Sequence, residues 1–177
     1  LGAGMMGGGI AWATASRGVP CILKDVTLEA AQKGKSYSEK LAEKRNRPQV
    51  PGFIKPTANV QDLQGCDLLI EAVFEKRDLK AQVTKEAEPM LAPGGIFASN
   101  TSALPITGLA QASAKPEHFI GLHFFSPVDK MQLVEIIKGR KTSPETLARA
   151  YDYVLQIGKI PIVVNDSRGF YTSRTFG

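Results

Sequence analysis

The sequence predicts an α/β fold of the doubly wound type, whose mostly parallel sheet has an antiparallel portion late in the chain. Short apolar segments alternate with segments of helical pattern along the 177 residues, the order that produces parallel strands joined by helices. The run at 67–74 is almost continuously apolar, as in a strand covered on both faces. Residues 118–125 and 132–138 are joined by a linker too short for a helical crossover, so we expect these two strands to be antiparallel.

The composition is that of a globular protein and argues against several functions. Lys and Arg outnumber Asp and Glu by 22 to 17, but the basic residues are dispersed and do not alternate with aromatic ones, so we expect no nucleic acid partner. No apolar run approaches the roughly 20 residues of a membrane span, and we expect none. The two histidines and two cysteines lack metal-ligand spacing, which predicts no metal site, and isolated thiols favour a cytoplasmic location.

The chain begins LGAGMMGGGI, in which three glycines have the spacing G-x-G-x-x-G. Gly2 allows a tight turn, Gly4 lets backbone approach a pyrophosphate, and Gly7 lets helix and strand pack closely. Free N–H groups at the start of the helix expected over 10–17 would bind the phosphates. Such a loop also occurs as a plain turn, and only Leu1 stands where a strand should precede it. We therefore expect the first strand to be truncated.

An acidic residue supplies the second part of a dinucleotide site. Asp25 follows the strand expected at 19–24 and lies roughly 20 residues after the first glycine, the usual separation for a carboxylate that binds the adenosine ribose. Because a carboxylate repels a 2′-phosphate, Asp25 should select NAD over NADP, an effect that Lys24 beside it would soften slightly. Together these features predict a Rossmann-type domain over residues 1–168.

The remaining elements follow from caps, chain breakers and apolar spacing. We expect helices at 28–46 (after the cap Thr27), 77–91, 105–112 and 144–156, and further strands at 96–99 and 160–164. Residues 52–66 are interpreted as a connection with minor strand candidates at 53–54 and 58–60. On the helix at 77–91, Leu79, Val83 and Leu91 are expected to share one face.

Ligands of doubly wound sheets bind where the strands end at their carboxyl side. That rule places five parts of the sequence in one crevice, namely the glycine loop, Asp25, the segment 72–75, the segment 100–102 and His123.

Several motifs then occur in a fixed order along the chain: IEAVFE, FASNTS, GLHFFSP, LVEII and the terminal DSRGFYTSR. With the glycine loop, they make the chain resemble the NAD-binding domain of L-3-hydroxyacyl-CoA dehydrogenases over its whole length. LKD at 23–25, HFFSP and GFYTSR look closest to the dehydrogenase part of bacterial multifunctional fatty-acid oxidation proteins. The resemblance implies NAD as cofactor and oxidation of a (3S)-3-hydroxyacyl-CoA to the 3-oxoacyl-CoA, the third step of β-oxidation.

The resemblance assigns catalysis to three residues. His123 in GLHFF is the expected general base, because the C3 hydroxyl must lose a proton and imidazole titrates near the working pH. Glu135 is expected to orient the imidazole, and Ser102 to lie near the nicotinamide and the substrate hydroxyl. Without the resemblance, the simpler readings are a histidine bonded to backbone, a glutamate facing solvent and a serine that caps a turn.

The expected cofactor contacts come from several segments: Gly2, Gly4, Met6, Gly7, Asp25, Ala72, Val73, Phe74, Glu75, Lys80, Ser102 and Ser126. Met6 would offer its backbone N–H to the pyrophosphate, and Lys80 would serve the nicotinamide ribose, although an exposed helix lysine is the simpler reading. Ser126 stands where many relatives have an asparagine, which puts a direct contact there in doubt, and Ser173 replaces another asparagine that faces the substrate. The expected substrate contacts are Ser102, His123 and Ser173.

The resemblance also implies a helical C-terminal domain, of which residues 169–177 would be the start. Such a domain shapes the acyl-CoA site and commonly mediates dimerisation, so we expect a homodimer or a part of a multienzyme fatty-acid oxidation complex. Without it, the chain should be weakly active or inactive. Two alternatives remain open: a dehydrogenase of another β-hydroxy acid, and a catalytically inactive nucleotide-binding module.

Overall fold

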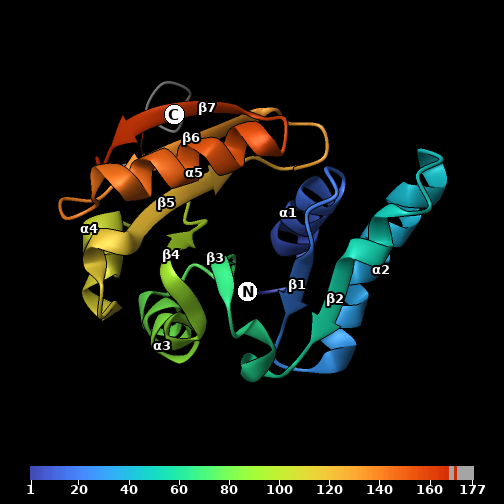
Figure 1. Cartoon of the computed structure of the whole chain (residues 1–177), viewed down its shortest axis with the longest axis horizontal. Helices are drawn as coiled ribbons and strands as arrows, with labels where there is room; N and C mark the ends of the chain where they lie inside the picture. Colours follow the sequence, from blue (N-terminus) through green and yellow to red (C-terminus); the bar gives the residue numbers. More distant parts are fainter. Residues whose placement is uncertain (168–169, 171–177) are drawn as a thin grey trace.

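The computed structural model describes residues 1–167 and residue 170 (Figure 1). The strands are β1 (Cys21–Lys24), β2 (Ile54–Thr57), β3 (Cys66–Glu71), β4 (Leu91–Ser99), β5 (Phe119–Phe124), β6 (Leu133–Lys138) and β7 (Ile160–Asn165). The α-helices are α1 (Met5–Ala15), α2 (Leu28–Lys44), α3 (Arg77–Ala87), α4 (Ile106–Leu109) and α5 (Pro144–Gln156). Short 3₁₀ helices cover Val50–Phe53, Val60–Leu63, Glu88–Met90, Ala110–Ala112 and Pro116–His118. Ser173 and the expected start of a helical domain lie outside the described residues, Phe170 excepted.

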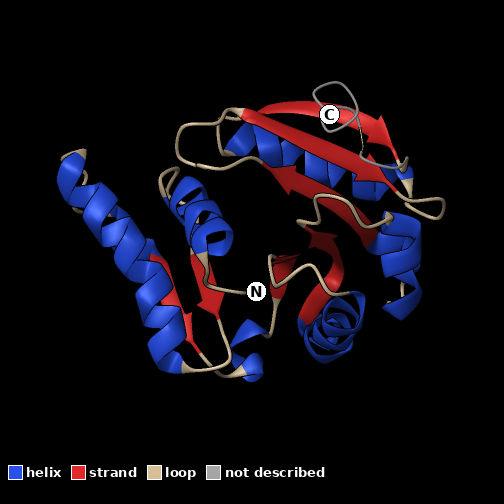
Figure 2. Cartoon of the chain, turned by 180° about the vertical axis from the view of Figure 1, so that it is seen from behind, coloured by secondary structure: helices blue, strands red, loops and turns tan. Residues whose placement is uncertain are grey.

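The strands confirm the α/β class with a mixed sheet. One sheet has the order β3-β4-β5-β6-β7, in which every pair is parallel except β5 with β6. The predicted antiparallel portion is therefore present. β1 and β2 form a separate parallel pair. Figure 2 shows the two groups of strands from behind, with the N-terminus of the chain between them. Within the described residues, no helix is both long and apolar enough to cross a membrane.

The backbone of the first two residues joins the two groups of strands. The Leu1 amino group donates to the Ile70 carbonyl at 2.7 Å, and the Ala72 N–H donates to the Leu1 carbonyl at 2.7 Å. This is the hydrogen-bond pattern of a parallel strand neighbour of β3. On the other side, the Gly2 N–H donates to the Lys24 carbonyl of β1 at 2.8 Å.

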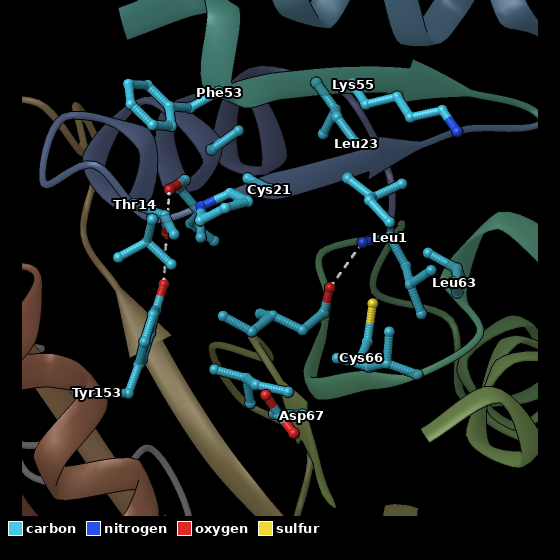
Figure 3. A pocket seen from close by; sticks show the side chains of 18 of the residues that line it. Leu1, Thr14, Cys21, Leu23, Phe53, Lys55, Leu63, Cys66, Asp67 and Tyr153 are labelled. Atoms are coloured by element: carbon cyan, nitrogen blue, oxygen red, sulfur yellow. Dashed lines mark hydrogen bonds between the residues drawn. The ribbon is translucent and has the colours of Figure 1, made fainter. Parts of the chain in front are cut away.

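Below this junction lies a cavity of about 1180 Å³ between β1 and β3 (Figure 3). Its wall is mostly apolar and includes Leu23, Leu63 and the two free cysteines, Cys21 and Cys66. Burial raises the pKa of the Cys21 thiol to about 11, so this group stays protonated at neutral pH. At one side of the cavity the Thr14 hydroxyl and the Tyr153 phenol are hydrogen-bonded at 2.7 Å, which ties α1 to α5.

Alternate residues of the large sheet pack on opposite faces, as strand geometry requires. On one face, Ile120, Leu122 and Ile136 pack with residues of α1 and α5. On the other face, Phe119 and Ile137 pack with residues of α3 and α4. His123 and Glu135 are in phase with Phe119 and Ile137, so they project on the α4 side of the sheet.

Glycine permits the close packing of α1 on its neighbours. A Cβ at Gly8 would stand 3.1 Å from the Gly34 carbonyl oxygen of α2, and a Cβ at Gly34 would overlap Ala3. Each helix backbone therefore approaches the other more closely than larger residues would allow. Helix α2 begins after Thr27 as predicted, since the Thr27 hydroxyl accepts from the Ala30 N–H at 3.1 Å.

Three predictions about elements were wrong. The first helix, expected over 10–17, begins at Met5 directly after the glycine loop and ends at Ala15. The segment at 52–66 contains a full strand, β2, which shares Ile54 with one minor candidate and pairs in register with β1. β4 begins at Leu91, so the helix before it ends at Ala87 and Leu91 is not helical. Leu79 and Val83 are four residues apart on α3 and partly buried on one face, as expected, while the fully buried residues of this helix are Lys80, Thr84 and Ala87.

Candidate active site

The glycine loop leads directly from the junction with β1 and β3 into the N-terminus of α1. Gly2 has a φ of +89°, a backbone conformation that residues with a side chain rarely adopt. A Cβ at Gly7 would overlap the Gly2 carbonyl oxygen, so the loop closes on the helix only with glycine there. At Gly4, the N-cap of α1, no atom lies within 4 Å of the position of a Cβ. The loop therefore leaves open space beside the N-terminus of α1, where Met6 lies in the first turn and phosphates are bound best.

Asp25 follows β1 and also holds this loop together. Its Oδ2 accepts a hydrogen bond from the Ala3 N–H at 2.7 Å, and its Oδ1 accepts from the Val26 N–H at 2.6 Å. The carboxylate thus lies beside the glycine loop. Its bond to Ala3 is a structural role that the sequence did not indicate.

Segment 72–75 leaves β3 at the same edge of the sheet. Phe74 is 81% exposed and Met5 of α1 is 71% exposed, so each segment presents one large apolar side chain to solvent. Lys80, by contrast, is 2% exposed, and its Nζ donates to both carboxylate oxygens of Glu71 at 2.9 Å each. The simple reading of Lys80 as an exposed lysine is therefore wrong, because the buried Glu71 neutralises its charge.

Glu75 connects segment 72–75 to the loop after β4. Its carboxylate accepts hydrogen bonds from the Thr101 hydroxyl, from the Ser102 N–H at 3.2 Å and from the Ser102 hydroxyl at 3.3 Å. Asn100 fixes the same loop to β5, since its Oδ1 accepts from the Phe124 N–H at 2.9 Å. Ser102 itself is exposed at the crevice, and in the described part of the chain it is bonded to Glu75 and not to His123.

His123 and Glu135 are brought together as a cross-strand pair of β5 and β6. The two residues are directly opposite in the antiparallel register, and His123 Nδ1 lies 2.9 Å from Glu135 Oε1. Glu135 is fully buried, whereas the His123 ring keeps some exposure. Since a carboxylate can only accept, Nδ1 carries the hydrogen of this bond, and Nε2 is the ring nitrogen that takes no part in it. The rings of Phe125 and Phe170 lie 4.5 and 6.0 Å from the imidazole, centre to centre, and hold its orientation.

The turn after β5 carries Ser126, whose hydroxyl donates to the Met5 sulfur at 3.4 Å. Asp129, later in this turn, accepts from the Tyr37 hydroxyl at 2.9 Å and from Arg45 at 2.5 Å. Burial and the hydrogen bond to Asp129 raise the pKa of Tyr37 to about 12. Helix α2 is thereby fixed to the turn that follows His123 and β5, a contact that nothing in the sequence pattern indicated.

Sequence reasoning also missed Glu71, the fully buried last residue of β3. One signal was available: Glu71 is the single charge within the apolar stretch LLIEAVF, and a buried carboxylate requires donors. In the described part of the chain, no group of three or more His, Cys, Asp or Glu residues could hold a metal ion.

A glycine loop at a helix N-terminus, an acid after the next strand and a buried His–Glu pair at the same sheet edge define a dinucleotide-dependent oxidoreductase domain. Residues 1–167 match the family model described as 3-hydroxyacyl-CoA dehydrogenase, NAD binding domain. The chain belongs to this family of NAD-dependent enzymes, and the expected cofactor is confirmed as NAD. The open space at Gly4 and the carboxylate of Asp25 fit this cofactor.

Solved structures agree with this assignment. The chain is 38% identical to (S)-3-hydroxybutyryl-CoA dehydrogenase from Ralstonia eutropha, with a TM-score of 0.92, over 98% of this chain and 64% of that one. It is 28% identical to the dehydrogenase part of multifunctional enzyme 1 from C. elegans, with a TM-score of 0.83, over 92% of this chain and 39% of that one.

A third neighbour acts on a different kind of molecule. It is the NAD⁺-dependent 5-formyl-3-hydroxy-2-methylpyridine 4-carboxylic acid 5-dehydrogenase, at 32% identity and a TM-score of 0.88, over 98% of this chain and 59% of that one. The chain thus spans less than two thirds of the length of each of these three structures.

The position of Asp25 leads to a prediction about cofactor choice. We expect Asp25→Ala and Asp25→Asn each to reduce the preference for NADH over NADPH about tenfold or more, because both remove the charge that repels a 2′-phosphate. Asp25→Asn should keep the bond to the Ala3 N–H and bind NADH more tightly than Asp25→Ala does. Titration calorimetry with both nucleotides measures this, and an unchanged preference in both variants would exclude the role of the charge.

Proposed function

We propose that this domain, within its full-length protein, catalyses the NAD-dependent oxidation of (3S)-3-hydroxyacyl-CoA to 3-oxoacyl-CoA in fatty-acid β-oxidation. The observation that carries the proposal is the buried hydrogen bond between His123 and Glu135 at the sheet edge that also holds the glycine loop. The similarity to a 3-hydroxybutyryl-CoA dehydrogenase supports the choice of substrate class.

In this proposal, His123 Nε2 accepts the proton of the C3 hydroxyl, while Glu135 keeps the hydrogen on Nδ1 and stabilises the imidazolium that forms. The Ser102 hydroxyl exchanges its hydrogen bond to Glu75 for one to the C3 oxygen of the bound substrate, while the Ser102 N–H stays bonded to Glu75 and holds the loop. Bound NAD⁺ supplies the acceptor for the hydride that leaves C3. The hydroxyl thus loses one proton and the carbon one hydride, which leaves the 3-oxo product.

The proposal also assigns residues of this site to the other parts of NAD. The loop residues Gly2, Gly4, Met6 and Gly7 would hold the pyrophosphate, and Asp25 the adenosine ribose. The segment Ala72 to Glu75 would line the ribose and nicotinamide side mainly through its backbone. Ser126 is hydrogen-bonded to Met5 at the start of α1, and we propose that Ser126 also contacts the cofactor directly.

A second candidate is an NAD-dependent dehydrogenase of another β-hydroxy acid. The observation that favours it is the 32% identity to a pyridine carboxylic acid dehydrogenase.

Oxidation of NADH by acetoacetyl-CoA in the full-length protein separates the two candidates. We expect turnover with acetoacetyl-CoA well above that with free acetoacetate. Turnover that does not require CoA would favour the second candidate, and calorimetry without any NADH binding would favour an inactive module.

We also propose a domain organisation around this site. The hydrogen bonds of Leu1 support its being the last residue of a strand that lies in the cavity between β1 and β3, parallel to both. A helical domain that begins at 169–177 would complete the acyl-CoA site and the dimer, and a multienzyme arrangement is supported by the C. elegans neighbour.

The strand proposal predicts different hydrogen exchange in two proteins. Amides of β1 and β3 should exchange at least tenfold more slowly in the full-length protein than in the chain 1–177, because the strand would close both edges. Amides of β5 and β6, which are paired in both, serve as the reference. Equal exchange of β1 and β3 in the two proteins would contradict the strand.

A further inference from the structure

The carboxylate of Glu71 is the meeting point of three segments at the carboxyl end of β3. Both of its oxygens accept from Lys80 Nζ of α3 at 2.9 Å. The Ser99 hydroxyl, at the end of β4, donates to Oε1, and the Val73 N–H donates to Oε2 at 3.2 Å. Glu71 and Ser99 are fully buried, so water does not compete for these bonds.

Lys80 connects the buried Glu71 to segment 72–75 at the crevice. Its Nζ lies 3.4 Å from the Val73 carbonyl oxygen and 4.0 Å from Glu75 Oε1, besides its two bonds to Glu71. Glu75 in turn holds Ser102. The ammonium group therefore stands between the buried carboxylate and the backbone and side chains of segment 72–75.

Stability alone does not account for such a pair. Removing two charges from water costs about as much free energy as their attraction returns, so a buried ion pair is often no more stable than a well-packed apolar pair. What the charges do provide is a fixed geometry, since each oxygen of Glu71 must face a donor. The residues fixed in this way belong to the edge of the sheet where the cofactor binds.

We propose that Glu71 is a positioning residue of the cofactor site, which holds the Lys80 ammonium and thereby sets the Val73 carbonyl and the Glu75 carboxylate for NAD binding. The proposal rests on the placement of NAD over the carboxyl ends of β3 and β4. It does not depend on which acyl-CoA, or which other acid, is the substrate.

A double-mutant cycle on NADH affinity tests the proposal in the full-length protein. Glu71→Gln places an amide where Ser99 and Val73 both present donors, and we expect the Kd for NADH to rise about tenfold. Lys80→Met should weaken binding at least as much. Because Glu71 acts through Lys80, the double variant should bind no more weakly than Lys80→Met alone. With saturating NAD, the kcat of Glu71→Gln should stay within about twofold of the wild type.

The controls separate positioning from folding. Glu39→Gln removes an exposed charge on α2 and should change neither Kd nor Tm. A lower Tm for Glu71→Gln with unchanged NADH affinity would overturn the proposal. So would a double variant whose fold-increase in the Kd for NADH equals the product of the increases in the two single variants. Should Glu71→Gln fail to fold, Ser99→Ala removes only one donor. It should raise the Kd about threefold with Lys80 present and not at all in Lys80→Met, and any other result would overturn the proposal.

Discussion

Glu135→Gln is expected to lower kcat by about 10²- to 10⁴-fold while the Kd for NADH stays within about threefold of the wild type. The amide of glutamine can donate to His123 Nδ1, which would favour the tautomer whose Nε2 carries the hydrogen and cannot accept a proton. The imidazolium that forms during oxidation would also lose its buried counter-charge. Stopped-flow measurement of NADH formation and titration calorimetry give the two quantities.

Glu117→Gln is the matched control for this prediction. Glu117 is exposed just before β5, so its substitution removes a charge near the same strand without touching His123. It should leave kcat unchanged. If Glu135→Gln also turned over at the wild-type rate, Glu135 would have no part in the proton transfer and its buried bond to His123 would be purely structural.

Gly7→Ala is expected to lower both the Tm and the affinity for NADH, the latter by 100-fold or more. The added Cβ would overlap the Gly2 carbonyl oxygen, and Gly2 itself is hydrogen-bonded to β1, so the loop cannot move without breaking its junction with the sheet. Thermal melts and calorimetry on the full-length protein measure both effects.

Two further glycine substitutions make this prediction specific. Gly4→Ala meets no protein atom within 4 Å, so it should leave the Tm unchanged and weaken NADH binding only, because the methyl group would enter the space left for the phosphates. Gly52→Ala, also without neighbours within 4 Å, should change neither quantity. A Gly7→Ala variant with the Tm and NADH affinity of the wild type would show that the loop is not constrained as described.

The sequence predicted those parts of the fold whose pattern is local. The apolar runs gave β3, β5, β6 and β7 to within a few residues, and the short linker after β5 gave the antiparallel pair. Thr27 was readable as a helix cap because threonine is a common residue at that position, and its hydroxyl does accept from the N–H three residues later.

The errors came from long-range pairing. β2 contains Lys55 and Pro56 and has little apolar signal of its own, so only its pairing with β1 makes it a strand. The burial of Lys80 was not expected because its side chain is charged, and this burial depends on a carboxylate nine positions earlier in the chain. Such compensation between residues of different elements leaves no periodic pattern to detect.

The sequence could place most of the predicted site residues in one crevice, because they lie at the carboxyl ends of strands. The proximity of His123 and Glu135 was expected from two neighbouring strands, but their direct opposition is a matter of register, which a sequence alone does not set. The hydrogen bond of Asp25 to the Ala3 N–H likewise became visible only with the loop in place.

The direct opposition of His123 and Glu135 also determines which changes of chain length the site can tolerate. The turn at 125–132 lies outside both strands, so residues added there lengthen the connection and leave the pairing of the strands unchanged. A single residue deleted between Leu133 and Glu135 would instead shift every later side chain of β6 to the opposite face of the sheet, and Glu135 with it. Length variation among natural or designed versions of this domain should therefore be found in that turn and be absent from Leu133 and Val134, the two residues of β6 that precede Glu135.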